Sequence, residues 1–173
     1  MVQREIGQDA RSFSSALDSA MRQAPDIILV GEVRNEEEVD ALLRASETGH
    51  LTLSTMHTKS AASTINRIKS LYSGSDQLRV LASLSDVARG FANQVLVKDK
   101  QGGRFAVREV LSVDEEVSDL IVSGDVAGIR RYQIEHEKTM EHGLADAVLR
   151  GKCTLDEARR VSQYRGLFDS LIN

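Results

Sequence analysis

The sequence lacks the features that would favour disulfides, membrane spans or nucleic-acid binding. Cys153 is the only cysteine, so neither an internal disulfide nor a cysteine-based zinc site can form. Tryptophan is absent and aromatic residues make up only 4%, which disfavours folds that stack bases on aromatic side chains. A formal net charge of −4 argues against a ligand bound through its phosphate backbone, so we expect no nucleic-acid partner.

Long apolar runs are missing as well. No run approaches the roughly 20 apolar residues that a membrane helix needs, and residues 1–5 do not resemble a signal peptide. We therefore expect a soluble protein of the cytoplasm. The composition, 41% hydrophobic and 28% charged, is that of an ordinary globular chain able to bury a sizeable core.

Residues 25–58 carry the most informative pattern. Two short apolar runs, 27–30 and 51–56, are separated by one amphipathic stretch of helix length. This order predicts two parallel strands joined by a crossover helix, and the continuous first run predicts burial on both faces of its strand. Polar residues follow each run at the carboxyl ends of the strands, where ligands collect in open α/β sheets. They are Glu32 and Arg34 after the first run, and Thr55, His57 and Thr58 after the second.

The remaining elements follow from capping residues, glycines and hydrophobic spacing. Ser12 or Ser14 predicts the start of a helix that ends before Pro25, and Asn35 with Glu38 predicts a capping box for the crossover helix. A helix from Ser60 to Leu71 and another to about Phe91 follow. Residues 95–97 and 105–111 predict a β-hairpin, and the chain is helical afterwards, with a second capping box at 154–157.

Glu32 is the main catalytic candidate. A carboxylate just past a buried strand can orient and deprotonate a water molecule aimed at a γ-phosphate. In many such sites a preceding acidic residue holds Mg²⁺, but that position here is Gly31. The alternative is that residues 31–35 form only a solvated turn.

Two histidines flank the second strand. His57 could donate a hydrogen bond to a phosphate oxygen, or could be a structural histidine within a loop. Period-2 alternation places His50 and His57 on opposite faces, so we expect no shared metal ion. Arg34 suits a phosphate or carboxylate, although a single arginine often forms only a surface ion pair. His136, His142 and Cys153 receive no role.

Three segments together resemble the secretion ATPase family, which comprises the motors of type IV pili, type II secretion and related conjugation or type IV secretion systems. They are Gln3–Ile6, Ala24–Arg34 and Ser46–Ala61. The similarity covers residues 2–111 and is greatest to the pilus-retraction branch and its Dot/Tra-like relatives. Extension-type members carry four cysteines near the hairpin, and this chain has none there.

The resemblance implies the roles of individual residues. Residues 27–32 match the atypical Walker B motif, with Glu32 as the residue that activates water. Residues 49–58 match the histidine box, with His57 near the γ-phosphate and His50 supporting the loop. The implied catalytic residues are thus Glu32 and His57. The implied nucleotide-binding residues are Gly31, Arg34, His50, Thr55 and Thr58, and no residue is assigned to a metal.

The resemblance also implies an architecture. The expected fold is α/β, the C-terminal part of a RecA-like P-loop NTPase domain with parallel strands and crossover helices, followed by a β-hairpin and a small helical subdomain. We expect residues 1–111 to form the partial ATPase core and 112–173 the helical subdomain. The implied cofactors are ATP and Mg²⁺. The implied partners are copies of the subunit in a hexamer and the inner-membrane platform protein of a pilus or secretion machine, at which the motor is peripheral.

The family's phosphate-binding loop, Gly-x-x-x-x-Gly-Lys-Ser/Thr, is absent from the sequence. Without its backbone amides and lysine the γ-phosphate has no cradle, so we expect the chain alone to hydrolyse ATP negligibly. The chain resembles the C-terminal half of a motor subunit. Since the phosphate-loop strand of the family would lie beside residues 51–56, these residues are expected to form an apolar sheet edge prone to association.

Three functions stay open. The first is a segment of a hexameric motor ATPase that couples ATP hydrolysis to pilus dynamics, conjugation or protein export. The second is a truncated paralogue that joins an ATPase ring as a non-enzymatic interaction module. The third, ranked last, is a metal-dependent phosphoesterase that would use Glu32, His50 and His57.

Overall fold

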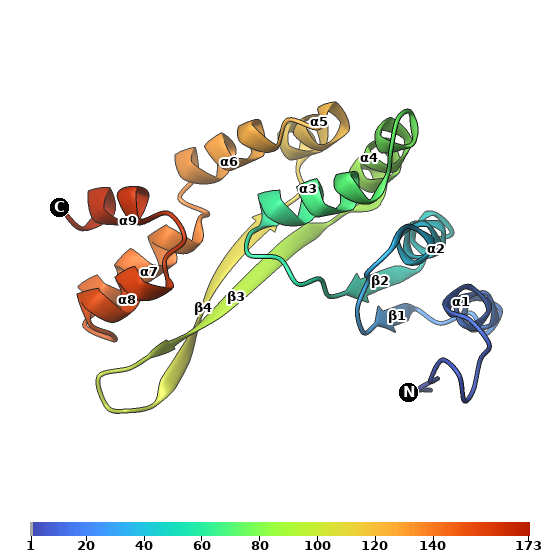
Figure 1. Cartoon of the computed structure of the whole chain (residues 1–173), viewed down its shortest axis with the longest axis horizontal. Coiled ribbons are helices and arrows are strands. Elements are labelled where there is room, and N and C mark those ends of the chain that lie inside the picture. Colours follow the sequence, from blue (N-terminus) through green and yellow to red (C-terminus); the bar gives the residue numbers. More distant parts are fainter. Residues whose placement is uncertain (1) are drawn as a thin grey trace. The chain divides into compact units, whose positions relative to one another are not determined.

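The computed structural model describes residues 2–173, which form two compact units. Unit 1 contains the chain up to residue 57 together with residues 67–88, and unit 2 contains residues 58–66 and 89–173. Figure 1 labels the elements in chain order; α3 (Ala61–Leu71) begins in unit 2 and ends in unit 1. The predicted division at residue 112 is a different one, and it stays a prediction.

Unit 1 contains a parallel pair of strands joined through a helix. Ile27 pairs with Leu51 at one end of the ladder and Val30 with Ser54 at the other. The crossover helix packs against the first helix, the second strand and a later helix. The predicted strand–helix–strand unit and the α/β fold class are therefore confirmed. The elements are α1 (Phe13–Met21), β1 (Ile27–Val30), α2 (Glu36–Glu47), β2 (Leu51–Ser54) and α4 (Asp76–Val87).

The N-terminal ends of the first two helices are fixed by side chains. Ser12, not Ser14, caps α1: its hydroxyl accepts a hydrogen bond from the Ser15 backbone N–H, and the Ser15 hydroxyl accepts one from the Ser12 N–H. Asn35 caps α2 by accepting from the Glu38 N–H at 3.0 Å. Each cap satisfies a backbone donor that has no partner within the helix.

The sheet of unit 1 is buried on one face only, which corrects the expectation of burial on both faces. Ile28 and Val30 are buried, whereas the exposed fractions are 56% for Ile27 and 70% for Leu29. Their partners in the β2 ladder are also exposed, with exposed fractions of 48% for Leu51 and 49% for Leu53. Within unit 1, α2 packs against β2, and the face that carries Ile27, Leu29, Leu51 and Leu53 is left exposed.

A polar cluster joins α2 to the segment that precedes and includes α4. The Tyr72 hydroxyl donates to the Glu36 carbonyl and to Asp40 Oδ1, at 3.1 and 3.0 Å. Burial and the hydrogen bond to Asp40 raise the pKa of Tyr72 well above its usual value. Arg79 forms an ion pair with Asp40 at 3.2 Å and lies over the Tyr72 ring. These contacts hold the crossover helix, and therefore the loop before it, in place.

Unit 2 is built on an antiparallel hairpin covered by helices. The first strand begins at Gly90, so the prediction that a helix continues to Phe91 is wrong. Ala88 adopts an extended conformation that ends α4, and Phe91 pairs with Leu111 in the ladder. Phe91 fits the helical spacing of α4, but it equally continues the alternation of Val95 and Val97. The elements are β3 (Gly90–Lys98), β4 (Arg104–Ser112), α5 (Glu115–Ser123), α6 (Val126–Glu135), α7 (Met140–Leu149), α8 (Leu155–Val161) and α9 (Arg165–Ile172).

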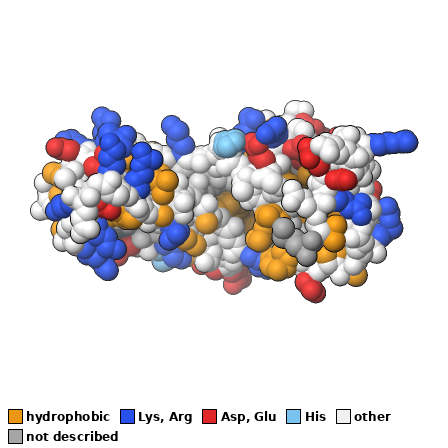
Figure 2. All heavy atoms as spheres, turned by 90° about the horizontal axis from the view of Figure 1, so that it is seen from below, with side chains coloured by type: hydrophobic (Ala, Val, Ile, Leu, Met, Phe, Trp, Pro, Cys, Tyr) orange, Lys and Arg blue, Asp and Glu red, His pale blue; other side chains and the backbone are white. Residues whose placement is uncertain are grey.

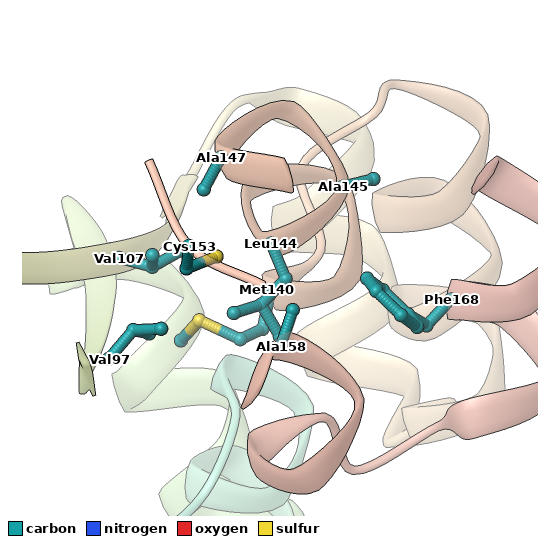
Figure 3. Packing of buried hydrophobic residues seen from close by; sticks show 9 residues of the cluster. All are labelled: Val97, Val107, Met140, Leu144, Ala145, Ala147, Cys153, Ala158 and Phe168. Carbon is teal, nitrogen blue, oxygen red and sulfur yellow. The ribbon is translucent and has the colours of Figure 1, made fainter. Parts of the chain in front are cut away.

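The core of unit 2 lies between the hairpin and its last three helices. Val97 and Val107 project from the strands, while Met140 and Leu144 of α7 meet them from the helical side (Figure 3). Phe168 of α9 is fully buried against this cluster. The remaining members are Ala145, Ala147, Cys153 and Ala158. Burial raises the pKa of the Cys153 thiol, which makes it a structural residue rather than a nucleophile.

A buried carboxylate ties two helix ends to the hairpin. Glu109 of β4 is 4% exposed. Its Oε1 accepts a hydrogen bond from the Ala61 N–H of α3 at 2.7 Å, and its Oε2 accepts one from the Met140 N–H of α7 at 3.3 Å. Both donors lie in the first turn of a helix, where backbone N–H groups have no intrahelical partner. Glu109 therefore anchors α3 and α7 to the same strand.

Candidate functional site

The candidate site lies at the carboxyl ends of β1 and β2. Because the two strands are parallel and in register, the residues that follow them meet at one edge of the sheet. The Val33 N–H donates to the Thr55 carbonyl at 3.0 Å, beyond the last pair of the ladder. The Thr55 hydroxyl donates to the Gly31 carbonyl at 2.5 Å. These two bonds hold the loop after β1 against the loop after β2.

Glu32 lies at the centre of this edge. Its Oε2 is 2.5 Å from Arg34 Nη2, and its Oε1 is 3.2 Å from His57 Nε2. The Glu32 side chain is 22% exposed, whereas that of His57 is 90% exposed. The structure thus brings together a carboxylate, a guanidinium and an imidazole, and it leaves the imidazole open to an incoming group.

The charges of this trio shift the pKa of the carboxyl group. The hydrogen bond from Arg34 is the largest cause that lowers the pKa of Glu32 below its usual value, and the charges of Arg34 and His57 act in the same direction. The same hydrogen bond raises the pKa of Arg34. Glu32 is accordingly ionised at neutral pH, which is the state that a general base or an orienting carboxylate requires.

Glu38 is a residue of this site that the sequence analysis placed differently. In a reciprocal capping box its carboxylate would accept from the Asn35 N–H. Instead, Glu38 Oε2 accepts from the Arg34 N–H, one residue earlier, at 2.6 Å. Glu38 therefore holds the backbone of the residue whose side chain holds Glu32. The Asn35-x-x-Glu38 spacing was the signal for this contact, but spacing alone does not tell which backbone N–H the carboxylate accepts from.

Two other predicted site residues form different contacts. His50 precedes β2, and its Nδ1 lies 3.1 Å from the Ala45 carbonyl at the end of α2. With about 3.3 Å per strand residue, the four residues of β2 separate the backbones of His50 and His57 by more than 10 Å. Thr58 belongs to unit 2, where its hydroxyl lies 2.6 Å from the Thr64 hydroxyl. Of the two histidines, only His57 forms an ion-pair contact with Glu32 within residues 2–173.

Comparison with known proteins assigns the chain to a family. A family model described as "Type II/IV secretion system protein" matches residues 2–98. The chain belongs to this family. Among its relatives, the twitching motility protein of Neisseria gonorrhoeae is 37% identical over 166 residues, which cover 93% of this chain and 44% of that protein. The type IV pilus retraction ATPase PilT of Pseudomonas aeruginosa is 42% identical over 125 residues, covering 72% of this chain and 36% of that protein.

Solved structures of family members share the fold. The pilus retraction motor PilT with bound ADP superposes with a TM-score of 0.85 and 36% identity, covering 94% of this chain and 47% of that one. The Legionella pneumophila ATPase DotB gives a TM-score of 0.83 and 29% identity, covering 92% of this chain and 44% of that one. The chain thus spans less than half the length of these relatives. Within residues 2–173, no helix combines the length and apolar character that crossing a bilayer requires.

Proposed function

We propose that this chain supplies the water-activating half of the ATPase site of a secretion or pilus motor. The observation that carries the proposal is the meeting of Glu32 and His57 on adjacent parallel strands, 3.2 Å apart. The family includes pilus retraction ATPases. At the γ-phosphate of ATP, a carboxylate can accept a proton and an imidazole can donate a hydrogen bond. Glu32 would orient and deprotonate the attacking water, and His57 would donate to a phosphate oxygen.

Arg34 has a second task in this proposal. It neutralises Glu32 at 2.5 Å while its own side chain is 73% exposed. Both carboxylate oxygens are engaged in this arrangement, one by Arg34 and one by His57. Nucleotide binding would draw the two cationic or donor groups toward the phosphate, because a triphosphate offers more negative charge than one carboxylate. Glu32 would then be free to accept a hydrogen bond from water.

The nucleotide and the metal ion require groups beyond this edge. A PilT structure contains bound ADP, which supports a nucleotide as the ligand. Gly31, Arg34 and Thr55 are the residues of this edge that the family resemblance assigns to nucleotide binding. No group of three or more acidic, histidine or cysteine side chains within residues 2–173 could hold a metal ion. Mg²⁺ would therefore be held mainly by the ATP phosphates and water, as is common for this ion. A phosphate-binding loop from outside this sequence would complete the site.

We place the motor in a hexameric ring of its own subunits, at the cytoplasmic side of an inner-membrane platform protein of a pilus or secretion machine. The names of the relatives, which include type II secretion proteins and pilus ATPases, support this setting. ATP hydrolysis would drive domain movements that extend or retract a pilus or export protein substrates. By itself the chain is expected to hydrolyse ATP negligibly, since it has no phosphate cradle.

The substitution Glu32→Gln tests this function in a subunit that carries the chain together with a phosphate-binding loop. The amide keeps the size of the side chain but cannot accept the proton, so steady-state ATP hydrolysis should be lost while nucleotide still binds. Glu37→Gln is a matched control, because Glu37 is an exposed residue in the first turn of α2 and His57 pairs with Glu32. Wild-type turnover in the Glu32 variant would refute the assigned role.

An interaction module is the second candidate, and the exposed apolar face of the unit 1 sheet, on which Leu29 has an exposed fraction of 70%, is the observation that favours it. Such a chain would join an ATPase ring without hydrolysing ATP. The coding DNA upstream of Met1 separates the two candidates. An in-frame phosphate-loop motif there would support the motor, and a stop codon directly upstream would support the interaction module.

A further inference from the structure

The loop between β1 and α2 is held at three successive residues. The Val33 N–H donates to the Thr55 carbonyl at 3.0 Å, and the Arg34 N–H donates to Glu38 Oε2 at 2.6 Å. The Asn35 side chain then accepts from the Glu38 N–H at 3.0 Å. The loop is thus fixed on one side by the segment after β2 and on the other by Glu38 of α2, which contacts two of the three residues.

Glu38 differs from its acidic neighbours in α2. Glu36, Glu37 and Glu38 occupy the first turn of the helix, where negative charge is favourable. Glu36 and Glu37 are exposed, whereas Glu38 is half-buried. Figure 2 shows Asp and Glu side chains beside Lys and Arg side chains at several places on one face of the molecule, so charge alone does not distinguish Glu38. Its distinguishing feature is a charge-assisted hydrogen bond to a backbone N–H, which fixes the position of the main chain.

The helix that carries Glu38 is itself held firmly. It packs against α1, β2 and α4. Its Asp40 accepts from the Tyr72 hydroxyl at 3.0 Å and forms an ion pair with Arg79 at 3.2 Å. Arg34, in contrast, lies in a loop and has a side chain that is 73% exposed. A carboxylate on a packed helix can therefore fix the backbone of this loop residue.

The Arg34 side chain extends from this fixed backbone to Glu32, two residues earlier. Its Nη2 is 2.5 Å from Glu32 Oε2. An arginine side chain is long and has many rotamers, so the region that its guanidinium can reach depends on where its backbone is held. Among the residues of this edge, Glu38 is the one whose side chain holds the Arg34 N–H.

We propose that Glu38 is a positioning residue of the ATPase reaction. Its carboxylate holds the Arg34 backbone so that the guanidinium stays beside Glu32, at the edge where the γ-phosphate would bind. Glu38 acts only through Arg34 and does not touch the substrate. The inference rests on the proposed function and adds to it a residue that the catalytic roles of Glu32 and His57 do not include.

Titration of the Glu32 carboxyl group in the chain alone tests the position of the guanidinium without nucleotide. The hydrogen bond from Arg34 is the largest cause that lowers the pKa of Glu32. Glu38→Ala removes the acceptor of the Arg34 N–H, so the pKa of Glu32 should rise. Glu38→Gln removes the charge but keeps an acceptor oxygen, so the pKa of Glu32 should stay at or below its wild-type value, because a nearby negative charge raises the pKa of a carboxyl group.

The direction of the change separates positioning from charge. If Glu38 acted only through its charge, both variants would lower the pKa of Glu32. Glu38→Asp keeps the charge on a side chain shorter by one methylene group, so it should raise the pKa of Glu32 as Glu38→Ala does. In an Arg34→Gln background, Glu38→Ala should cause no further rise, because the two changes act on one contact. Carbon-detected NMR measures each titration.

The kinetic test uses a subunit that carries the chain together with a phosphate-binding loop. Glu38→Ala should lower kcat about tenfold, since a small misplacement of a reacting or orienting group slows the chemical step. The dissociation constant for ATP should change little, because the phosphate loop supplies most of the binding. Glu38→Gln should recover most of kcat. Glu37→Ala, in the same turn of α2 but exposed, is the matched control and should behave like wild type.

Circular dichroism establishes that each variant is folded, and Glu38→Asp takes the place of Glu38→Ala should the alanine variant unfold. A pKa of Glu32 that does not rise when the acceptor is lost, an equal rise in the Arg34→Gln background, or wild-type kcat in Glu38→Ala would each overturn the proposal. Failure of the proposed function gives a different result. Full turnover in Glu32→Gln would refute that function, while the titrations would still establish whether Glu38 positions Arg34.

Discussion

His57 Nε2 lies 3.2 Å from Glu32 Oε1, although the whole of α2 separates the two residues in the sequence. The parallel ladder between β1 and β2 creates this proximity, and the bond from Val33 N–H to the Thr55 carbonyl extends it beyond the strands. A carboxylate and an imidazole held this way can act on one ligand from two sides. The relationship is the geometric basis for the catalytic roles proposed for both residues.

The first prediction concerns His57. In a subunit with a complete nucleotide site, His57→Ala should lower kcat by about 10²-fold, the usual scale for loss of one donor to a transition-state oxygen. Nucleotide affinity should change little, since the phosphate loop supplies most of the binding. His136→Ala is the matched control, because that ring stacks on Tyr132 in unit 2. Steady-state hydrolysis and fluorescent-nucleotide titration measure the two quantities. Equal kcat values for the two variants would contradict a catalytic His57.

The second prediction concerns the pH dependence of Glu32. Its pKa is lowered, chiefly by the hydrogen bond from Arg34, so Arg34→Gln should raise it toward the ordinary value of about 4.3. A carbon-detected NMR titration of the side-chain carboxyl group measures this shift. Arg22→Gln, on the exposed end of α1, should leave the titration unchanged. A Glu32 titration that is identical in wild type and Arg34→Gln would rule out the ion pair in solution.

The sign of the stability effect follows from the same shift. Because the folded-state pKa of Glu32 lies below the unfolded-state value, the ion pair stabilises the native chain above the unfolded pKa. That contribution is lost as the pH falls through the folded-state pKa. In Arg34→Gln this part of the acid dependence of unfolding should disappear.

The sequence predicted which residues meet at the end of the two strands. It did not predict every contact that these residues make, or which face of the sheet is buried. Apolar runs with a helix-length spacer are enough to place Glu32, Thr55 and His57 at one edge, because parallel pairing fixes where strand ends meet. Local spacing could not reveal that Glu38 would bond to the Arg34 N–H, since this depends on the path of the loop. It also could not reveal that Ile27 and Leu29 would be exposed, because burial depends on which elements cover a face.

The end of α4 shows a similar limit. Apolar residues at helical spacing continue through Phe91, and nothing in that pattern marks the change of period. Pairing with Leu111 across the hairpin decides that Phe91 is a strand residue. The contact is not local, so a prediction based on neighbouring residues cannot contain it.

The last prediction concerns Glu109, whose carboxylate joins β4 to α3 and α7. Glu109→Ala removes both acceptors. The Met140 N–H is then buried without a partner, and the Ala61 N–H keeps only the side-chain oxygen of Asn93, at 2.9 Å. The free energy of unfolding should fall by about 3 kcal/mol, since each unsatisfied buried donor costs roughly 1–3 kcal/mol. Glu109→Gln keeps one acceptor oxygen and should lose less. Glu135→Ala, at the exposed end of α6, should change stability by no more than about 0.5 kcal/mol. Urea unfolding followed by circular dichroism measures all three variants, because the chain has no tryptophan to report by fluorescence. If Glu109→Ala were as stable as the Glu135 control, the carboxylate would not be anchoring the two helices to the strand.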